Sequence, residues 1–598
     1  MEDTTMTKKI LTLLLTAAVF TACSEMHDDI SAVQQQPDAP ALKGVVMQVA
    51  DIPYAETAVA GATRSTMAVD ATGLTFTWSA GDKTGVYSSA DGFALFNLTA
   101  GAGTSSATFD GGGFTLTDGA TYYSFFPYAS AATDKAAVPV DFTGQTLTQD
   151  DDMVSPMTKD YLYASAVADA GNAQFNYSHL GSFVRTKLTM PASTSVESVD
   201  FIPMYAELTQ QGTVDVTAAL NPLTATVTSP KLSLTLSGVD VPSGGELTLW
   251  GAMAPQDLSA TTEAVAIVAH SGSDIYSARV AGKNLQAGKA YRWAATPILP
   301  TGYSHGLTVS TKAQKNYGTG LGQYSAITWL GDNHYAVVHD KENGGGIVLF
   351  DFDIADDGTI GEVTRTTPAG TSGSAITDMD NEGIAYFNGK LYVSAEADQS
   401  VREYTTDGTA TGNSFTIPAD MAVGKITANA GFEALTYNAT THLFWTTTET
   451  ALPKDSYLPR LHRLQSFGED MQPAQRYLYQ MDAPQYSSEG ATQYVYGISA
   501  MAALDDGRLV VLEREIYTNT STYTAHGVAK LYVVDPVHDT AGILRKSLLT
   551  TITTGLLDLA NYEGMCLGPT LSDGSRCLVL IGDSQGTAYE MLQVVTIK

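Results

Sequence analysis

The sequence predicts an all-β protein in which β-sandwiches are followed by a β-propeller, and three observations predict it. Glycine (54 residues) and tyrosine (30 residues) are abundant, as in chains built from strands and turns. Short β-rich runs separated by turns fill residues 43–300 without a convincing helix, which is typical of β-sandwiches. A two-strand unit recurs along residues 301–598, which is typical of a propeller. Because 598 residues exceed what one core supports, we expect separate domains at 43–300 and 301–598.

The net charge limits the class of partner. The chain has 63 acidic and 32 basic residues, so its formal net charge is −31. Such a surface repels nucleic acid, and no basic stripe stands out to bind it, so we expect no nucleic-acid partner. The same excess of carboxylates favours divalent cations, which prefer oxygen ligands.

Residues 1–22 have the pattern of a signal peptide. In "TKKILTLLLTAAVFTAC", two lysines precede an apolar run too short to span a membrane comfortably, and small residues precede Cys23. The segment resembles a bacterial lipoprotein signal, which implies cleavage before Cys23 and a lipid on its sulfur. An ordinary secretory signal with an incidental cysteine is the alternative.

The polar segment of residues 23–42 follows and reads as a flexible tether. It begins with "CSEMHDD", which resembles the acidic tag that sends lipoproteins of the Bacteroides group to the outer face of the outer membrane. The resemblance implies a protein anchored in the outer membrane by its lipid and exposed at the cell surface.

Four motifs in residues 43–300 carry a family resemblance. They are "FTWSAGDKTGVYS", "YYSFFPY", "AQFNYSHLGSFVRTKL" and "LQAGKAYRW", in the order seen in fimbrillin-like (Mfa-like) lipoproteins. The resemblance implies two tandem transthyretin-like β-sandwiches and, as partners, fimbrial subunits. We expect Trp78 to lie in the core and His179 to be held by its neighbours, because a lone histidine rarely forms a metal site.

Arg64 is a candidate processing site. Fimbrial subunits of this kind lose their first strand by cleavage after an arginine, and Arg64 is the only basic residue between Lys43 and Lys83. An exposed arginine in a linker is the favoured alternative, since strand addition also needs a donor strand.

Five copies of one hairpin unit can be read in residues 301–598. They are "QYSAITWLGDNHYAVVHDK", "DNEGIAYFNGKLYVSAEAD", "GFEALTYNATTHLFWTTTET", "GISAMAALDDGRLVVLERE" and "NYEGMCLGPTLSDGSRCLVLIGDSQ". Each opens on Ser or Glu, crosses a turn and ends on an acid. The opening residues are Ser325, Glu382, Glu433, Ser499 and Glu563, and the closing residues are Asp340, Glu396, Glu449, Glu513 and Asp583. At the usual blade length of about 40–50 residues, this region has room for six blades.

The two ends of a hairpin lie at the same end of its sheet, so the copies bring eight carboxylates and two hydroxyls to one rim of the propeller. Carboxylates this close raise one another's pKa unless a cation neutralises them. Calcium, which takes six to eight oxygen ligands, is the expected cofactor. The alternative is that each acid only caps N–H groups of a loop.

The motifs "DNEGIA", "GFEALTY", "ISAMAALDDGRLVVLERE" and "NYEGMCLGP" resemble the phytase-like family, also called esterase-like activity of phytase. The likeness covers residues 305–598. It implies a six-bladed propeller and a calcium-assisted hydrolase of phosphate esters, with Glu382, Glu433 and Glu563 as catalytic residues. The residues expected to hold a substrate oxyanion are His339, Arg402 and Arg514. Because few basic residues line the expected mouth, a non-catalytic surface binding or adhesion protein associated with fimbriae remains the alternative.

Cys566 and Cys577 flank the turn of the fifth hairpin. They could pair as a disulfide or remain two buried thiols, because the strand register decides whether their sulfurs meet. The sequence contains no His-Glu-x-x-His, Gly-x-Ser-x-Gly or Walker motif, which excludes the commonest sites of metalloproteases, serine hydrolases and nucleoside triphosphatases.

Overall fold

The computed structural model describes residues 45–55, 67–69, 73–88, 92–130, 132–147, 159–218, 222–318, 322–340, 346–371, 376, 379–583 and 589–598. Cys23, Arg64, the expected signal peptide and the expected tether lie outside these residues. Within them the fold is all-β, as predicted; the helices are single turns, η2 (Ala369–Thr371), η3 (Ala419–Met421) and η4 (Pro453–Asp455). In this described part, no helix has the length and apolar character needed to cross a membrane.

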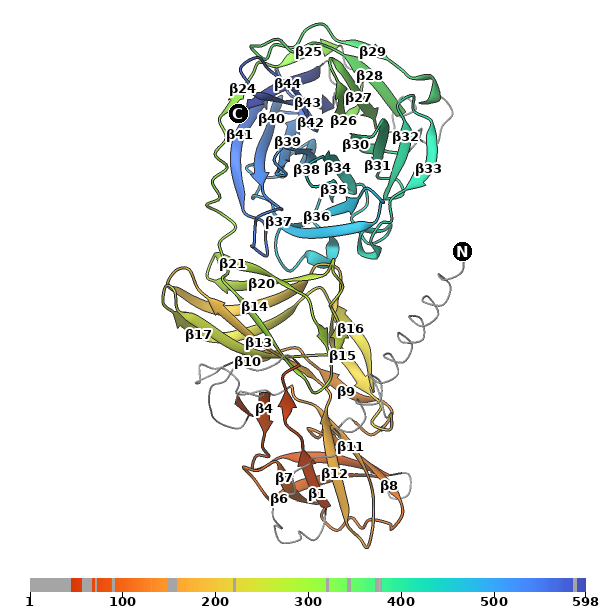
Figure 1. The fold of residues 1–598 in the computed structure, drawn as a ribbon, viewed down its shortest axis with the longest axis vertical. Helices are drawn as coiled ribbons and strands as arrows, with labels where there is room; N and C mark the ends of the chain where they lie inside the picture. Colours follow the sequence, from red (N-terminus) through yellow and green to blue (C-terminus); the bar gives the residue numbers. More distant parts are fainter. Residues whose placement is uncertain are drawn as a thin grey trace, which may run out of the picture.

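The first unit is a sheet that closes on itself (Figure 1). Its strand β1 pairs with β12 on one side and with β7 on the other, so the expected open sandwich is here a seven-stranded barrel. In sheet order the strands are β1 (Val45–Val49), β12 (Ala173–His179), β11 (Leu162–Val167), β8 (Thr121–Phe126), β5 (Lys83–Ser88), β6 (Gly92–Ala100) and β7 (Ser106–Asp110). Trp78 is fully buried in the barrel core and donates its indole N–H to the carbonyl of Met47, as expected of a core residue.

The second unit is a two-layer sandwich. One layer is β10 (Gln145–Leu147), β17 (Leu232–Val241), β14 (Thr194–Pro203), β20 (Ala264–Ser271) and β21 (Asp274–Ala281). The other layer is β18 (Glu246–Met253), β13 (Ser182–Thr189) and β23 (Ala290–Ala295). Apolar side chains of both layers share one core, in which Phe201 and Ile267 from the first layer meet Leu249 and Trp293 from the second.

Three small sheets flank these two units. They are β16 (Leu223–Ser229), β15 (Leu208–Val214) and β9 (Val138–Asp141); β19 (Gln256–Asp257) and β22 (Asn284–Leu285); and β2 (Ile52–Pro53), β4 (Gly73–Phe76) and β3 (Met67–Val69).

The C-terminal half consists of five antiparallel sheets that follow one another around a ring, here called the five-sheet ring (Figure 1). The first is β26 (Tyr324–Gly331), β27 (His334–His339), β28 (Gly346–Asp351) and β29 (Thr364–Thr366). The second is β30 (Asn381–Phe387), β31 (Lys390–Ala395), β32 (Ser400–Thr405) and β33 (Ala410–Ser414). The third is β34 (Phe432–Asn438), β35 (Leu443–Thr448), β36 (Leu461–Gly468) and β37 (Pro473–Gln480). The fourth is β38 (Gln493–Ala503), β39 (Leu509–Asn519), β40 (Thr524–Val534) and β41 (Lys546–Gly555).

The fifth sheet joins the two ends of this half of the chain. It contains β42 (Asn561–Thr570), β43 (Arg576–Asp583) and β44 (Glu590–Ile597), and both β24 (Val309–Thr311) and β25 (Lys315–Gly318) pair with β44. The first strands of consecutive sheets pack against each other, and β42 packs against β26, so the ring closes. The expectation of six blades is not confirmed, because the described residues form five sheets and the opening strands complete the fifth rather than start a sixth.

The sandwich and the five-sheet ring share a buried interface. Ile202 and Met204 of the sandwich pack with Leu461, Leu478 and Ile543 of the ring in one apolar cluster. A hydrogen bond also crosses the boundary. The hydroxyl of Ser277 in the sandwich accepts from the backbone N–H of Ile543 in the C-terminal half at 3.0 Å. The two halves therefore pack as one body (Figure 1).

Candidate functional site

Each sheet of the five-sheet ring has a β-bulge in its first strand at the residue that opens its hairpin. The bulged residues are Ser325, Glu382, Glu433, Ser499 and Glu563. A bulge adds one unpaired residue and redirects its side chain, and it is often found beside an active site. All five side chains are buried, although a strand end would normally expose them. The first strands lie around the centre of the ring (Figure 1). The charges of Glu433 and Glu563 act on Glu382, and that of Glu563 acts on Glu433, so these side chains form one central cluster.

The second strand of each hairpin brings another polar residue to the same level. This residue lies opposite the residue two positions before the bulge. The backbone N–H of Asp340, for example, donates to the carbonyl of Gln323, and that of Glu449 donates to the carbonyl of Gly431. The residues in this closing position are Asp340, Glu396, Glu449, Arg514 and Asp583. We call the five opening and five closing residues, together with Asp380, the carboxylate ring.

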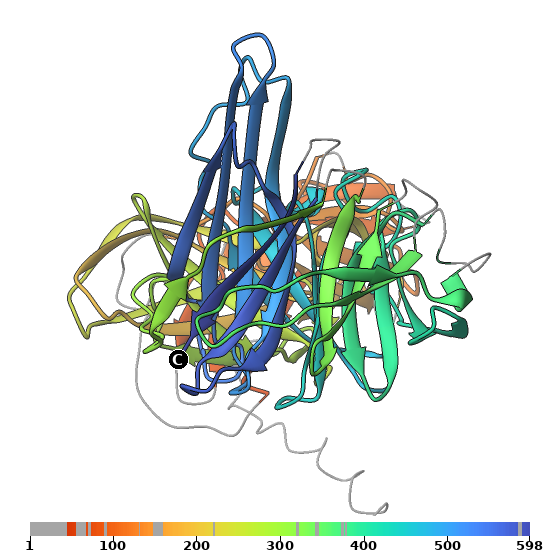
Figure 2. The same cartoon turned by 90° about the horizontal axis from the view of Figure 1, so that it is seen from above.

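Glu513 does not belong to this ring, contrary to the sequence-based expectation. The strands of the fourth sheet continue beyond the closing position to Asn519, and Figure 2 shows this sheet extending past the others. Successive side chains of a strand alternate between its faces, so Arg514 faces the ring and Glu513 faces away. Glu513 instead accepts hydrogen bonds from the Tyr479 hydroxyl at 2.5 Å and the Lys546 ammonium at 2.6 Å.

Arg514 supplies the positive charge of the ring. Its guanidinium is buried and donates to Glu563 and, at 2.6 Å, to Glu449, with a longer contact of 3.3 Å to the Asn561 side chain. Burial alone would lower the pKa of Arg514, but the charges of Glu563 and Glu449 outweigh it and hold the pKa well above its ordinary value. Arg514 is therefore a fixed counter-ion, and the expected role of holding a substrate oxyanion would require it to leave two carboxylates.

One guanidinium does not neutralise the carboxylates around it. Burial, followed by the charges of Glu433 and Glu563, raises the pKa of Glu382 well above its ordinary value. Burial and the charge of Glu449 do the same for Glu433. Burial raises the pKa of Glu563 to about 8, although Arg514 opposes the shift. Near neutral pH the cluster therefore carries protons or needs a cation.

Three carboxylates of the ring form the tightest group. Each of Asp340, Asp380 and Glu382 can offer one oxygen, and these oxygens lie within 4.8 Å of one another. Among the described residues, the ring and its border also contain buried oxygens that have no hydrogen-bond partner, namely Ser325 Oγ, Asn381 Oδ1 and Glu433 Oε2. Carboxylate, hydroxyl and amide oxygens are the ligands of a hard cation such as calcium, so the residues present fit that ion.

Asp380 was not identified from the sequence. It lies two residues before the bulge at Glu382, in a left-handed turn with φ of 53°, and this turn brings its carboxylate back beside Glu382. A non-glycine residue with positive φ is uncommon, and aspartate is among those that tolerate it best. The "DMDNEG" stretch contained the signal, because an aspartate two residues before an expected metal ligand is placed by the turn that opens the strand.

Several predicted site residues lie elsewhere or have other partners. Glu396 accepts a hydrogen bond from the backbone N–H of Gly431, which is the loop-capping role considered as an alternative. Arg402, on the third strand of its sheet, is paired with Asp398 near the surface. The imidazole of His339 packs against the ring of Tyr324 at a centroid distance of 4.6 Å, with the two planes tilted by 39°, and burial lowers the pKa of His339.

An ion pair between the exposed Arg365 and the buried Glu590 joins the first sheet to the fifth and was missed by sequence reasoning. Their nearest side-chain atoms are 2.9 Å apart, and Glu590 also accepts from the backbone N–H of Gly322 at 2.9 Å. The two residues are 225 positions apart, so no local pattern predicts their contact.

Cys566 and Cys577 are both buried free thiols, so the second alternative is correct. Cys566 lies opposite Val579, two residues along the strand from Cys577, and the two sulfurs therefore do not meet across the hairpin.

Two families match the chain in the order that the motifs indicate. Residues 63–310 match the fimbrillin-like family, and residues 319–585 match the phytase-like family described as esterase-like activity of phytase. No curated protein matches the chain.

Solved structures match parts of the chain at low identity and low TM-score. A candidate cell adhesion protein from Bacteroides ovatus is 16% identical over 44% of this chain and 95% of its own, with a TM-score of 0.30. A fimbrial protein from the same species is 15% identical over 53% of this chain and 59% of its own, with a TM-score of 0.22. The aldose sugar dehydrogenase of Streptomyces coelicolor is 14% identical over 49% of this chain and 99% of its own, with a TM-score of 0.26.

Proposed function

We propose that this chain, in which a fimbrillin-like region precedes a phytase-like domain, is a cell-surface protein whose carboxylate ring binds calcium and hydrolyses phosphate esters. In this proposal the five-sheet ring is a five-bladed β-propeller at residues 301–598, and residues 43–300 hold it away from the membrane. A lipid on Cys23 and the tether of residues 23–42 would anchor the protein in the outer membrane.

The observation that carries the proposal is the group formed by Asp340, Asp380 and Glu382, whose oxygens lie within 4.8 Å of one another. Glu382 is buried and Asp340 is partly buried, and carboxylates this close repel one another, while the guanidinium of Arg514 is paired with two other carboxylates of the ring. A calcium ion would relieve the repulsion and complete its six to eight ligands with carbonyl oxygens and water.

The chemistry would be divided between the ion and the chain. When bound, calcium supplies charge neutralisation for a phosphate group and lowers the pKa of water. Glu433 and Glu563 are suited to move protons, because each is buried and has a raised pKa. The unpaired Glu433 Oε2 is the atom that would exchange a proton with the substrate or with water.

A second function, binding or adhesion without catalysis, is favoured by the state of the arginines. Arg514 is bound by Glu449 and Glu563, and Arg402 is bound by Asp398. A highly phosphorylated substrate normally meets free guanidinium or ammonium groups. The fimbrillin-like region supports an association with fimbriae in either case.

The test uses the full chain in calcium, in magnesium and in chelator. We expect calcium to raise the melting temperature and to support release of phosphate from p-nitrophenyl phosphate or phytate. Both effects should be lost in Glu382→Gln, while Glu469→Gln, which changes a carboxylate outside the ring that accepts from Tyr437 and His442, serves as the matched control. Stabilisation without turnover would favour the binding protein, and absence of both effects would refute the calcium site.

A further inference from the structure

A cavity of about 750 Å³ lies between the sandwich and the five-sheet ring, and none of the residues that line it belongs to the carboxylate ring. We call it the junction cavity. Residues of the N-terminal and the C-terminal half line it. They are Tyr205, Glu207 and Thr262 from the side of the sandwich, and Pro418, Ala419, Asp420, Gly424, Lys425, Pro453, Lys454 and Pro473 from the five-sheet ring. Its volume falls in the range of small-molecule sites, which occur preferentially at domain interfaces.

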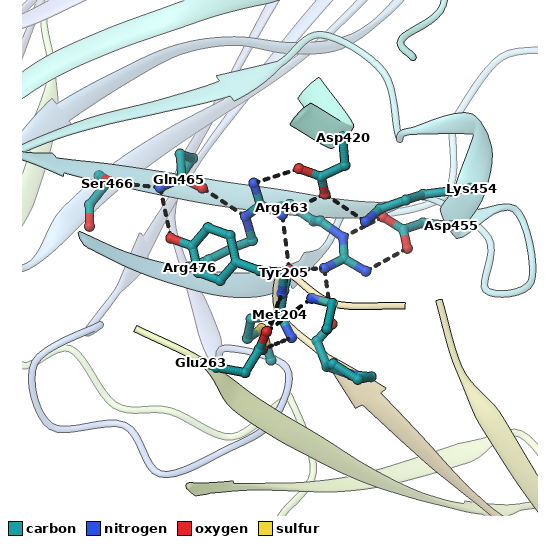
Figure 3. A network of polar contacts seen from close by, with 12 residues as sticks. Met204, Tyr205, Glu263, Asp420, Lys454, Asp455, Arg463, Gln465, Ser466 and Arg476 are labelled. Atoms are coloured by element: carbon teal, nitrogen blue, oxygen red, sulfur yellow. Dashed lines mark hydrogen bonds and ion pairs between the residues drawn. The ribbon is translucent and has the colours of Figure 1, made fainter. Parts of the chain in front are cut away.

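A rigid network of buried charges supports this cavity (Figure 3). Arg463 and Asp455 are both fully buried and form a two-point ion pair, with distances of 2.6 and 2.8 Å. Arg463 also donates to the backbone carbonyl of Met204 in the sandwich. Because these contacts tie the two halves together, the cavity is formed before any ligand binds.

The wall of the cavity is fixed in the same way. Asp420 accepts from Lys454 at 2.6 Å and from Arg476 at 2.6 and 3.1 Å, so both of its oxygens are occupied. Arg476 donates as well to the carbonyl of Met204 at 2.9 Å and stacks over the ring of Tyr205 (Figure 3). One face of that tyrosine is therefore already covered.

The charges around the cavity balance, in a chain whose net charge is −31. The lining and its supporting network hold four basic and four acidic side chains: Lys425, Lys454, Arg463 and Arg476, with Glu207, Asp420, Asp455 and Glu263. Most are paired with each other, and Glu263 is satisfied by the backbone N–H groups of Met204 and Ala206. A polyanion would meet no group of free cations here, and a metal ion would meet no group of free carboxylates, so the site suits an uncharged ligand.

The rest of the lining indicates the ligand's class. Pro418, Ala419, Pro453 and Pro473 contribute apolar surface to the lining, and Thr262 contributes a hydroxyl-bearing side chain. The lining residues come mainly from loops and from η3 and η4, and the one that belongs to a strand, Pro473 of β37, has no N–H to donate, so an extended peptide would find little strand edge to pair with. We propose that the junction cavity binds a short neutral oligosaccharide. The apolar C–H faces of the sugar would lie on the prolines, and its hydroxyls would bond to the polar side chains of the lining.

The proposal is tested by calorimetric titration of the full chain with maltotriose, cellotriose, chitotriose and N-acetyllactosamine. Ala419→Trp fills the cavity and should weaken the binding sugar by about tenfold or more. Val423→Trp places the same side chain on an exposed neighbour that does not line the cavity, and it should bind as the unmodified chain does. Thr262→Val removes one hydroxyl at nearly constant volume and should weaken binding by about two- to tenfold.

Three results would overturn the proposal. The first is that none of the four sugars binds at about 10 mM, a concentration at which even weak carbohydrate sites fill. The second is that a sugar binds equally well to Ala419→Trp and to the unmodified chain. The third is that the cavity takes a short peptide in place of the sugars. None of these results depends on calcium or on phosphate-ester hydrolysis, so this proposal can fail independently of the function proposed for the carboxylate ring.

Discussion

The calcium-free protein should become less stable as the pH rises from 6.5 to 8, because of Glu563. Burial raises the pKa of this carboxyl to about 8 in the folded state, against an ordinary value of 4.5. A raised pKa means that the folded state holds a proton that the unfolded state releases, so stability is full below pH 4.5 and is lost as the pH rises through 8. Each unit of pKa difference corresponds to about 1.4 kcal/mol, so the loss between pH 6.5 and 8 is about 2 kcal/mol.

The assay is urea unfolding of the full chain in chelator at pH 6.5 and at pH 8. Other groups titrate too, so the comparison is with Glu563→Gln, which keeps the shape of the side chain and removes its titration. The unmodified chain should lose about 2 kcal/mol more than Glu563→Gln over this interval. Saturating calcium should abolish the difference, since the ion replaces the proton as the neutralising charge. Equal losses in the two proteins would refute the reasoning.

Three further predictions concern single side chains. Arg463→Met leaves Asp455 buried without a counter-ion and should cost about 3 to 5 kcal/mol in denaturant unfolding, part of it regained when Asp455→Asn is added; a loss under 1 kcal/mol would contradict this. Arg514→Met removes the counter-ion of Glu449 and should enlarge the calcium-induced rise in melting temperature, measured by calorimetry; a smaller rise would count against the ring's excess charge. Glu513→Gln should lower stability by about 1.5 to 3 kcal/mol and leave the calcium-induced rise unchanged, and loss of that rise would place Glu513 in the site after all.

The hairpin motif predicted the opening residues of the carboxylate ring because it encodes their structural cause. A Ser or Glu before Gly or Ala marks the bulge in all five sheets, and the bulge directs the side chain to the centre whatever surrounds it. The closing residues were less certain, because they depend on where the second strand passes the rim. In four sheets the strand ends there, whereas β39 continues to Asn519, so Glu513 was mistaken for the closing residue, a position that Arg514 holds.

Contacts between distant parts of the chain could not be predicted from local patterns. The pairing of β1 with both β12 and β7 closes the first sheet into a barrel, and it joins residues that are 128 positions apart in one case and 58 to 64 in the other. The same holds for Arg463, whose buried charge makes sense only with Asp455 and the carbonyl of Met204 beside it. In the sequence, Arg463 looks like any other arginine of an expected strand, and nothing near it indicates that its side chain is buried.

The most direct test of the account is to locate calcium in crystals of the full chain grown with the ion, using its anomalous scattering at long X-ray wavelength. The account predicts an anomalous peak beside Asp340, Asp380 and Glu382, with oxygen ligands at about 2.3–2.6 Å. The absence of a peak at this position under saturating calcium would contradict it and would leave the carboxylate ring as a protonated structural cluster.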